Sequence, residues 1–380
     1  MIPTVNQFAQ DINAKIMGRY VEPQIYAEGP AVKRGPGGLI SGKDPAQTEQ
    51  AGYTQNFNID IIGLDVGDID GDKENDLVLI DSSNVYIYKW SGNTFTKFMT
   101  VKGGRSSDYV YVSVADLDHN GYAEIYITNL TVGYSSSFVL EWQGNSLQKI
   151  AGSQGYLFRV TDIPGKGPSL LGQKRSSTGG FSRYVYLLER DGNRFSKIER
   201  LDLPPRANVF NFMQGRVTGT GEDTVLLGPT PTEFIFLFDS QNSKLWSSEE
   251  EFGGLDIYLS ETEYETETHN HISPPILLSD IDKDGQSEVV ICKNKSSTGR
   301  LSSKLRLFTS GVLHLLAWDG YGLTTKWKTR KMQPIAGYSI KDVDNDRKPE
   351  IIIASGVRSK KALGALREIK RSVLTIYDLD

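Results

Sequence analysis

Four acidic loops, the short strands that follow them and hairpin turns between apolar runs predict that this 380-residue chain is an all-β protein, a β-propeller. The loops start at Asp68, Asp116, Asp280 and Asp342, and each leads into a strand of aliphatic or aromatic residues such as DLVLI or EIIIA. At 85–98, 138–150, 184–198 and 312–327, Gly-Asn or Asp-Gly separates two apolar runs, as in VYIYKWSGNTFTKF. Such turns indicate hairpins, and four antiparallel strands per unit are typical of a propeller blade.

Two further units fit the same template, although their acidic loops have decayed. The third unit keeps Asp162 but places Pro164 and Lys166 at ligand positions, and the fourth keeps only Asp223 among glycines. Six loops then recur at intervals of roughly 46 to 65 residues, which predicts six blades. Seven blades is the alternative, if residues 18–50 form a degenerate unit.

The sixth unit ends after its third strand, SVLTIYDLD at 372–380. A propeller leaves no open sheet edge if a segment from the N-terminal side supplies the missing strand. We expect YTQNFNI at 53–59 to be that segment, with VEPQIYA at 21–27 as the alternative donor.

The first 50 residues differ from the repeats. Val5, Phe8, Ile12 and Ile16 recur at helical spacing, and residues 29–50 are rich in Gly, Pro and polar side chains. We therefore divide the chain into a short N-terminal helix with a linker, 1–50, and a propeller, 51–380. The helix packs outside the propeller or is the remnant of a preceding domain of the same polypeptide.

Each acidic loop places oxygen side chains at positions 1, 3, 5 and 9, with a backbone carbonyl available at position 7. This spacing suits a hard cation that takes six to eight oxygen ligands at about 2.3–2.6 Å, as calcium does. An EF-hand would need a bidentate Glu at position 12 and flanking helices. Here the last acid is at position 9 and strands flank the loop, so the sequence predicts a different calcium loop.

The loops DIDGDKEND, DLDHNGYAE, DIDKDGQSE and DVDNDRKPE resemble the calcium loops of FG-GAP or VCBS repeats, D-x-[DN]-x-[DN]-G-x-x-[DE]. Such repeats form the blades of the integrin α-chain head and of many bacterial surface proteins. Gly121 and Gly285 match the glycine of the pattern, whereas Lys73 and Arg347 replace it. The resemblance covers about residues 55–380.

The resemblance implies four structural Ca²⁺ ions, each held by side chains and by the carbonyl at position 7. The implied ligands are, loop by loop, Asp68, Asp70, Asp72, Glu74 and Asp76; Asp116, Asp118, Asn120, Tyr122 and Glu124; Asp280, Asp282, Asp284, Gln286 and Glu288; and Asp342, Asp344, Asp346, Lys348 and Glu350.

Composition narrows the function classes. The net charge of −5 argues against a nucleic-acid binder that works by general charge. The one cysteine, Cys292, lies in an apolar run and is expected to be buried. No apolar run approaches 18 residues, so we expect no transmembrane segment, and the start Met-Ile-Pro lacks a signal peptide's features. A mature form or a piece of a longer protein remains open.

The sequence contains no catalytic signature, and we expect a binding module rather than an enzyme. The connections between second and third strands are long and basic, and they leave the propeller opposite the acidic loops. The candidate binding residues there are Arg175, Lys295, Arg300, Lys360, Lys361 and Arg367. They would suit an acidic protein or polysaccharide at the bacterial cell envelope, in the periplasm or on the cell surface. The alternative is a polysaccharide lyase or hydrolase with a site at the central channel.

Overall fold

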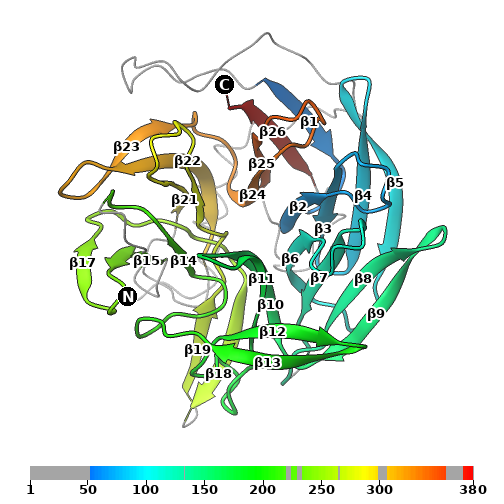
Figure 1. Ribbon diagram of the computed structural model, residues 1–380, viewed down its shortest axis with the longest axis horizontal. Helices are drawn as coiled ribbons and strands as arrows, with labels where there is room; N and C mark the ends of the chain where they lie inside the picture. The colour runs from blue at the N-terminus through cyan, green and yellow to red at the C-terminus, as the bar shows by residue number, and fades with distance from the viewer. Residues whose placement is uncertain are drawn as a thin grey trace, which may run out of the picture.

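In the described part of the chain, six four-stranded sheets are arranged around a central axis (Figure 1). The computed structural model describes residues 52–131, 133–219, 224–228, 233–263, 266–297, 306–356 and 371–379, and within these residues every regular element is a strand. Each sheet has four antiparallel strands, which confirms the predicted six-bladed propeller. The described residues contain no seventh blade.

The first three blades are continuous in sequence, and their strands run outward from the axis in chain order. Blade 1 contains β2 (Gly63–Gly67), β3 (Asp76–Ile80), β4 (Asn84–Ser91) and β5 (Thr94–Lys102). Blade 2 contains β6 (Tyr109–Ala115), β7 (Glu124–Asn129), β8 (Ser137–Gln143) and β9 (Ser146–Gln154). Blade 3 contains β10 (Leu157–Ile163), β11 (Gly167–Gln173), β12 (Tyr186–Asp191) and β13 (Arg194–Arg200).

The next two blades have the same order, and the sixth combines both ends of the described chain. Blade 4 contains β14 (Phe212–Gly215), β15 (Thr224–Leu227), β16 (Phe236–Phe238) and β17 (Lys244–Ser247). Blade 5 contains β20 (Leu277–Ser279), β21 (Glu288–Ser296), β22 (Phe308–Trp318) and β23 (Leu323–Lys328). Blade 6 contains β24 (Ile335–Lys341), β25 (Glu350–Gly356), β26 (Ser372–Asp378) and β1 (Tyr53–Phe57).

The ring is closed by β1, which pairs antiparallel with β26 from Tyr53 opposite Ile376 to Phe57 opposite Ser372. Tyr53 and Phe57 point into the core, while Thr54 between them is exposed. The N-terminal side of the chain therefore supplies the outer strand that the sixth unit lacks, as predicted for 53–59. The alternative donor at 21–27 and the predicted helix and linker at 1–50 lie outside the described residues.

Burial follows the position of a strand within its blade. The second strands β3, β7 and β25 are buried at every residue, because neighbouring blades cover both of their faces. The outer strand β13 buries only Phe195. This contrast explains why the second strands are the continuous aliphatic runs of the sequence.

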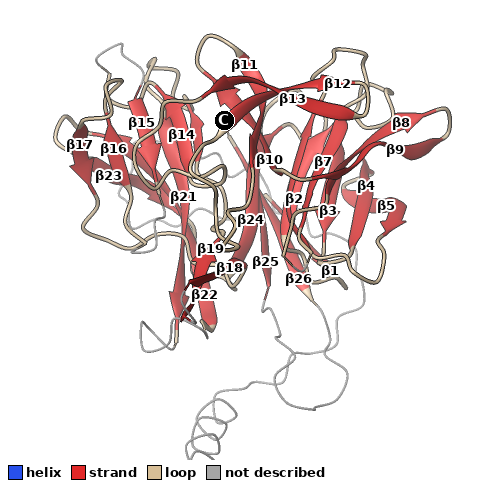
Figure 2. Ribbon diagram, turned by 90° about the horizontal axis from the view of Figure 1, so that it is seen from below, coloured by secondary structure: helices blue, strands red, loops and turns tan. Residues whose placement is uncertain are grey.

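Connections between first and second strands leave one face of the ring, which we call the acid-loop face. Connections between second and third strands, and those between blades, leave the opposite face, which we call the hairpin face. An additional hairpin, β18 (Tyr258–Glu263) with β19 (Thr266–His271), is inserted between blades 4 and 5. It projects from the hairpin face, away from the acidic loops (Figure 2).

The base of the β18–β19 hairpin closes the central channel on the hairpin face. Leu255, Leu259 and Ile272 are buried in the same core cluster as Ile62 and Val112, which belong to or adjoin the innermost strands. The cavity beneath them measures about 30 Å³ and is lined mainly by apolar side chains. This volume holds no more than one or two water molecules.

Deeper in the ring, Arg159 of β10 is buried with only 2% of its surface exposed. Its guanidinium donates hydrogen bonds to the carbonyls of Val209, Phe212 and Ile276. The side chain therefore ties blade 3 to blade 4 and to the segment that enters blade 5. No helix within the described residues has the length and apolar character to cross a bilayer.

Candidate metal centres

Each acidic loop is held by its first aspartate, which accepts the backbone N–H of the residue at position 6. The four acceptor–donor pairs are Asp68 and Lys73 at 2.8 Å, Asp116 and Gly121 at 2.9 Å, Asp280 and Gly285 at 3.0 Å, and Asp342 and Arg347 at 3.0 Å. The repetition shows that the spacing read from the sequence produces one loop conformation four times.

The residue at position 6 has a left-handed backbone in all four loops. Gly121 and Gly285 have φ of 89° and 88°, which glycine adopts without strain. Lys73 and Arg347 have φ of 71° and 72°, where a Cβ atom is crowded by backbone. Lys73 and Arg347 therefore form the same turn as glycine does, but with a strained backbone.

The acid at position 9 lies at the start of the second strand and is almost fully buried in each loop. One of its carboxylate oxygens accepts the N–H of the second loop residue, and the other is left for the loop interior. The hydrogen bonds are Ile69 to Asp76 at 3.2 Å, Leu117 to Glu124 at 2.9 Å, Ile281 to Glu288 at 2.9 Å and Val343 to Glu350 at 2.8 Å.

In every loop, carboxylate oxygens from positions 1, 3 and 9 lie within 4.8 Å of one another. Two ligands on opposite sides of a calcium ion are separated by about twice the Ca–O distance of 2.3–2.6 Å, so this spacing fits one shared ion. The groups are Asp68, Asp70 and Asp76; Asp116, Asp118 and Glu124; Asp280, Asp282 and Glu288; and Asp342, Asp344, Asp346 and Glu350.

Position 5 differs between the loops. Asp346 joins the group of the fourth loop, whereas Asp72 and Asp284 do not join theirs. Asn120 and the carbonyls of Glu74, Tyr122, Gln286 and Lys348 remain predicted ligands. The structure thus assembles 13 of the side-chain oxygens that the sequence assigned to metal.

Burial raises the pKa of Asp76, Glu124 and Glu350, which are acids at position 9. Burial raises the pKa of Asp76 and of Glu124 to about 7 each. The pKa of Glu350 rises to about 8, through burial and then through repulsion from Asp344, Asp342 and Asp346. Ionisation of these carboxyl groups is therefore disfavoured unless a positive charge lies nearby.

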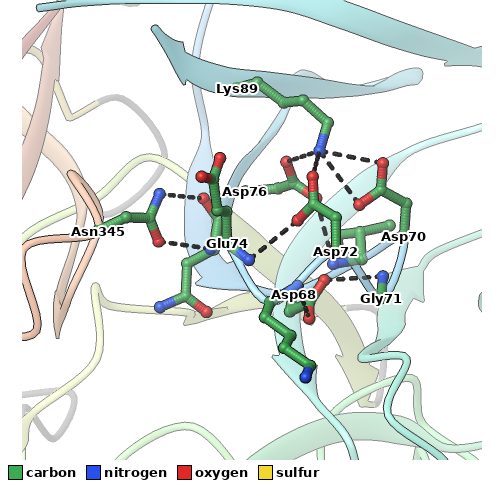
Figure 3. A network of polar contacts seen from close by, with 11 residues as sticks. Asp68, Asp70, Gly71, Asp72, Glu74, Asp76, Lys89 and Asn345 are labelled. Atoms are coloured by element: carbon green, nitrogen blue, oxygen red, sulfur yellow. Dashed lines mark hydrogen bonds and ion pairs between the residues drawn. The ribbon is translucent and has the colours of Figure 1, made fainter.

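In the first loop, the chain supplies that charge itself. The ammonium of Lys89, on β4, lies 3.0 Å from Asp70, 2.8 Å from Asp72 and 3.3 Å from Asp76 (Figure 3). Lys89 is directly opposite Asp76 in the β3–β4 register, and its ammonium also lies 5.0 Å from the ring centre of Phe98.

The second and third loops also have protein cations beside them. Arg190 of blade 3 reaches blade 2, where it forms an ion pair with Asp118 and lies 3.9 Å from Glu124. Lys326 of β23 lies 2.8 Å from Asp282 and 3.3 Å from Glu288, with 46% of its side chain exposed. The three cations were missed in the sequence because each comes from a strand outside the loop.

The fourth loop is different. Among the residues that the structure describes, no lysine or arginine forms an ion pair with its carboxylates. Glu350 is directly opposite Asp378 in the β25–β26 register, at the place that Lys89 has in blade 1. Burial raises the pKa of Asp344, and repulsion from Asp346, Asp342 and Asp378 adds to the shift.

The first and fourth loops contact each other across the junction of blades 1 and 6. Asn75 donates its backbone N–H to the Asn345 side chain at 2.6 Å and its side-chain amide to the Asp342 carbonyl at 2.8 Å. Hydrogen bonds between the first and fourth acidic loops therefore help to hold the last blade against the first.

In the third unit, the connection between the first two strands is too short to form a nine-residue loop. The β10–β11 ladder continues to Ile163 opposite Gly167, so only three residues form the turn. Asp223 of the fourth unit lies outside the described residues.

Residues 58–127 match the family described as FG-GAP-like repeat, and the matched segment contains the first two acidic loops. The chain is a six-bladed β-propeller, and its first two acidic loops lie in a segment similar to FG-GAP-like repeats. A search of curated proteins found no match. The match identifies the type of repeat and supports the comparison of its loops with calcium loops.

Of the six basic residues predicted to bind a partner, the structure describes two. Arg175 donates to the carbonyls of Gly179 and Thr131, so its guanidinium orders the loop around it. Lys295 is exposed on β21. The other four, Arg300, Lys360, Lys361 and Arg367, lie outside the described residues.

Two clefts open on the hairpin face, one on each side of the β18–β19 hairpin. The larger, about 670 Å³, is lined by residues that include Arg105, Asp108, Arg175, Asp256 and Tyr258. The smaller, about 370 Å³, we call the arginine cleft. Its lining includes Arg183, Arg206, Arg306, Asn208, Glu261 and His271. The sequence did not predict either cleft, because each needs several blades and the inserted hairpin together.

Proposed function

We propose that this propeller is a calcium-stabilised binding module of the bacterial cell envelope, in the periplasm or on the cell surface. Calcium holds the acid-loop face, and an acidic partner binds at the hairpin face. The observation that carries the proposal is this division of the ring into two faces, with carboxylate groups on one and a cationic cleft on the other.

Calcium is supported by the chemistry of the loops. The assembled ligands are carboxylate oxygens, which calcium and magnesium prefer. The side chain at position 5 joins the group in only one of the three loops that have an acid there, and such variation suits the variable coordination of calcium better than the strict octahedron of magnesium. A structural role follows because the carboxylates are engaged by backbone N–H groups and hold the turn between two core strands.

A thermal unfolding experiment tests the calcium role. Calcium at about 100 times its dissociation constant adds roughly 2.7 kcal/mol for each site that binds only the folded state. We therefore expect a higher melting temperature in millimolar calcium than in chelator. Identical calorimetric melting curves in calcium and in chelator would show that calcium does not stabilise the protein.

The arginine cleft supports an acidic partner. Arg306 forms an ion pair with Glu233 at the cleft wall. Arg183 and Arg206 form no ion pair within the described part of the chain, so their guanidinium groups are available to a carboxylate. Burial lowers the pKa of His271 to about 4, which keeps its imidazole neutral at pH 7.

We favour an acidic polysaccharide over a protein for this cleft. A volume of about 370 Å³ is in the range of small-ligand pockets, and the lining combines guanidinium, amide and hydroxyl groups that can bond to sugar hydroxyls and carboxylates. Binding rather than catalysis is supported by the central channel, whose cavity of about 30 Å³ is too small for a sugar residue.

The binding test uses polygalacturonate as the acidic probe and dextran as the neutral one. We expect polygalacturonate alone to bind, with affinity that falls as salt rises. The R183Q/R206Q variant should lose about tenfold or more in affinity, whereas R194Q, at an exposed arginine of the β12–β13 hairpin, should bind as the unchanged protein does. Equal binding by both variants, or a preference for dextran, would contradict the acidic-polysaccharide assignment.

A further inference from the structure

The four acidic loops share one backbone conformation but differ in what neutralises their carboxylates. The first loop has the ammonium of Lys89 within 3.3 Å of three carboxylates. At the equivalent register position the sixth blade has Asp378, an acid instead of a base. The first and fourth loops therefore differ in the charge of the residue that lies directly across the ladder from the acid at position 9.

An ammonium and a calcium ion cannot use the same carboxylates at once. Both cations need oxygens of the loop interior, and at a few ångströms two positive charges repel each other strongly in a partly buried environment. Lys89 is anchored by its strand and by Phe98, so it returns to the loop at a high effective concentration. Calcium must displace the ammonium before it binds. The apparent affinity is therefore the intrinsic affinity multiplied by the fraction of time for which the ammonium is away from the loop.

We infer that Lys89, Arg190 and Lys326 are built-in counter-ions that make calcium optional in the first three loops, and that the loop from Asp342 to Glu350 is the one that depends on calcium. The inference rests on the proposed calcium role and ranks the sites within it. The competition should be strongest in the first loop, with three carboxylate contacts, and weaker in the third, where Lys326 is 46% exposed.

Three observations on the fourth loop agree with the ranking. It is the loop in which four acids, including position 5, contribute oxygens to one group. One oxygen of Asp342 is buried without a hydrogen-bond partner, as are oxygens of Asp76 and Glu124, but those two lie beside Lys89 and Arg190. The residue opposite Glu350 is the acid Asp378, whereas the residue opposite Asp76 in the first loop is Lys89. A divalent cation would satisfy the unpartnered oxygen and the four charges together.

Two exchanges of charge test the inference, with calcium chloride titrated into the metal-free full chain in a calorimeter. The unchanged protein should show one tight binding step followed by weaker ones. K89M should convert one weak step into a tight one, with affinity increased about tenfold or more. D378K should weaken the original tight step by about tenfold or more, because it gives the fourth loop an ammonium of its own.

Two control variants separate charge from structure. D378N keeps the size of the side chain and lacks an ammonium, so the tight step should remain. K328M changes an exposed lysine on the same strand as Lys326 and should leave all steps unchanged. Circular dichroism establishes that each variant is folded, and D342N should remove the tight step and thereby assign it to the fourth loop.

The outcomes distinguish this inference from the calcium role itself. Four equal sites that K89M leaves unchanged, or a tight step that persists in D378K, would overturn the inference and leave calcium binding intact. If neither the unchanged protein nor K89M releases heat with calcium, and native mass spectrometry detects no bound ion, the calcium role fails and the inference fails with it.

Discussion

The residue at position 6 of each acidic loop has a left-handed backbone, although it is glycine in two loops and a basic residue in the other two. Lys73 and Arg347 adopt the left-handed conformation that Gly121 and Gly285 adopt at the same position. The sequence predicted the turn at all four positions, because the spacing of the acids is local. It could not show whether the two loops without glycine would keep the turn, since that depends on how strongly the loop is held at both ends.

The first prediction concerns this strain. K73G and R347G should each raise the free energy of unfolding by about 1 kcal/mol in chelator, because glycine removes the cost of a left-handed Cβ. Urea denaturation measures the change. E74G, one position later in the first loop and without a positive φ, should not stabilise the protein. A loss of stability in both K73G and R347G would contradict the strain.

The second prediction concerns His314 of β22, which is 92% buried beside Phe252 and Thr325. Burial lowers its pKa to about 4, with help from Lys293 and Lys328 and against the attraction of Glu250. The unfolded chain then binds a proton more readily than the folded one between pH 6.5 and 4. Stability contributed by neutral His314 is therefore present above pH 6.5 and lost as pH falls towards 4.

Replacement of His314 by Gln should remove about 2 kcal/mol of the decrease in stability between pH 8 and pH 5. The comparison of urea unfolding for the two proteins at both pH values isolates this residue from the other titrating groups. The variant H119N, in an exposed loop position, should keep the pH dependence of the unchanged protein. An H314Q variant with the same pH dependence would show that the buried imidazole does not contribute.

At the scale of elements, the strands were the most predictable part of the molecule. Aliphatic runs such as Glu350–Gly356 became fully buried second strands, and the missing outer strand of the last blade is Tyr53–Phe57, within the predicted segment 53–59. Both inferences depend on local pattern and on the rule that a ring leaves no edge. The cations Lys89, Arg190 and Lys326 were not predictable in this way, because their position depends on cross-strand register and on packing between blades.

The closure of the ring gives the third prediction. Thr54 is directly opposite Thr375 in the β1–β26 ladder, so their Cα atoms are close enough for a disulfide. The T54C/T375C variant should form this bond under oxidation and gain about 2–4 kcal/mol of stability that reductant removes. The only native cysteine, Cys292, is buried and should not interfere.

The displaced pair T54C/V373C tests the register. Val373 is opposite Asn56, two residues away from the position opposite Thr54, so a disulfide with Thr54 would need the strand to shift. Mass spectrometry after oxidation should find the bond in the first variant and free thiols in the second. The reverse result would show that β1 closes the ring in another register.

At the scale of the whole molecule, the sequence predicted the two faces but not what lies on the hairpin face. The acidic loops follow from nine-residue patterns, and their common exit follows from the repeat. The arginine cleft needs Arg183 and Arg206 from blade 3 and its exit, Arg306 from blade 5 and Glu261 from the inserted hairpin. These residues are far apart in sequence and become neighbours only through the ring, so no local pattern indicates them.

Anomalous diffraction from crystals grown in calcium shows directly whether the acidic loops hold calcium on one face of the ring. We predict an anomalous peak among Asp342, Asp344, Asp346 and Glu350, at about 2.3–2.6 Å from their oxygens. Crystals of K89M should show a second peak among Asp68, Asp70 and Asp76. A map without a peak at any of the four loops, at calcium concentrations that raise the melting temperature, would contradict the account.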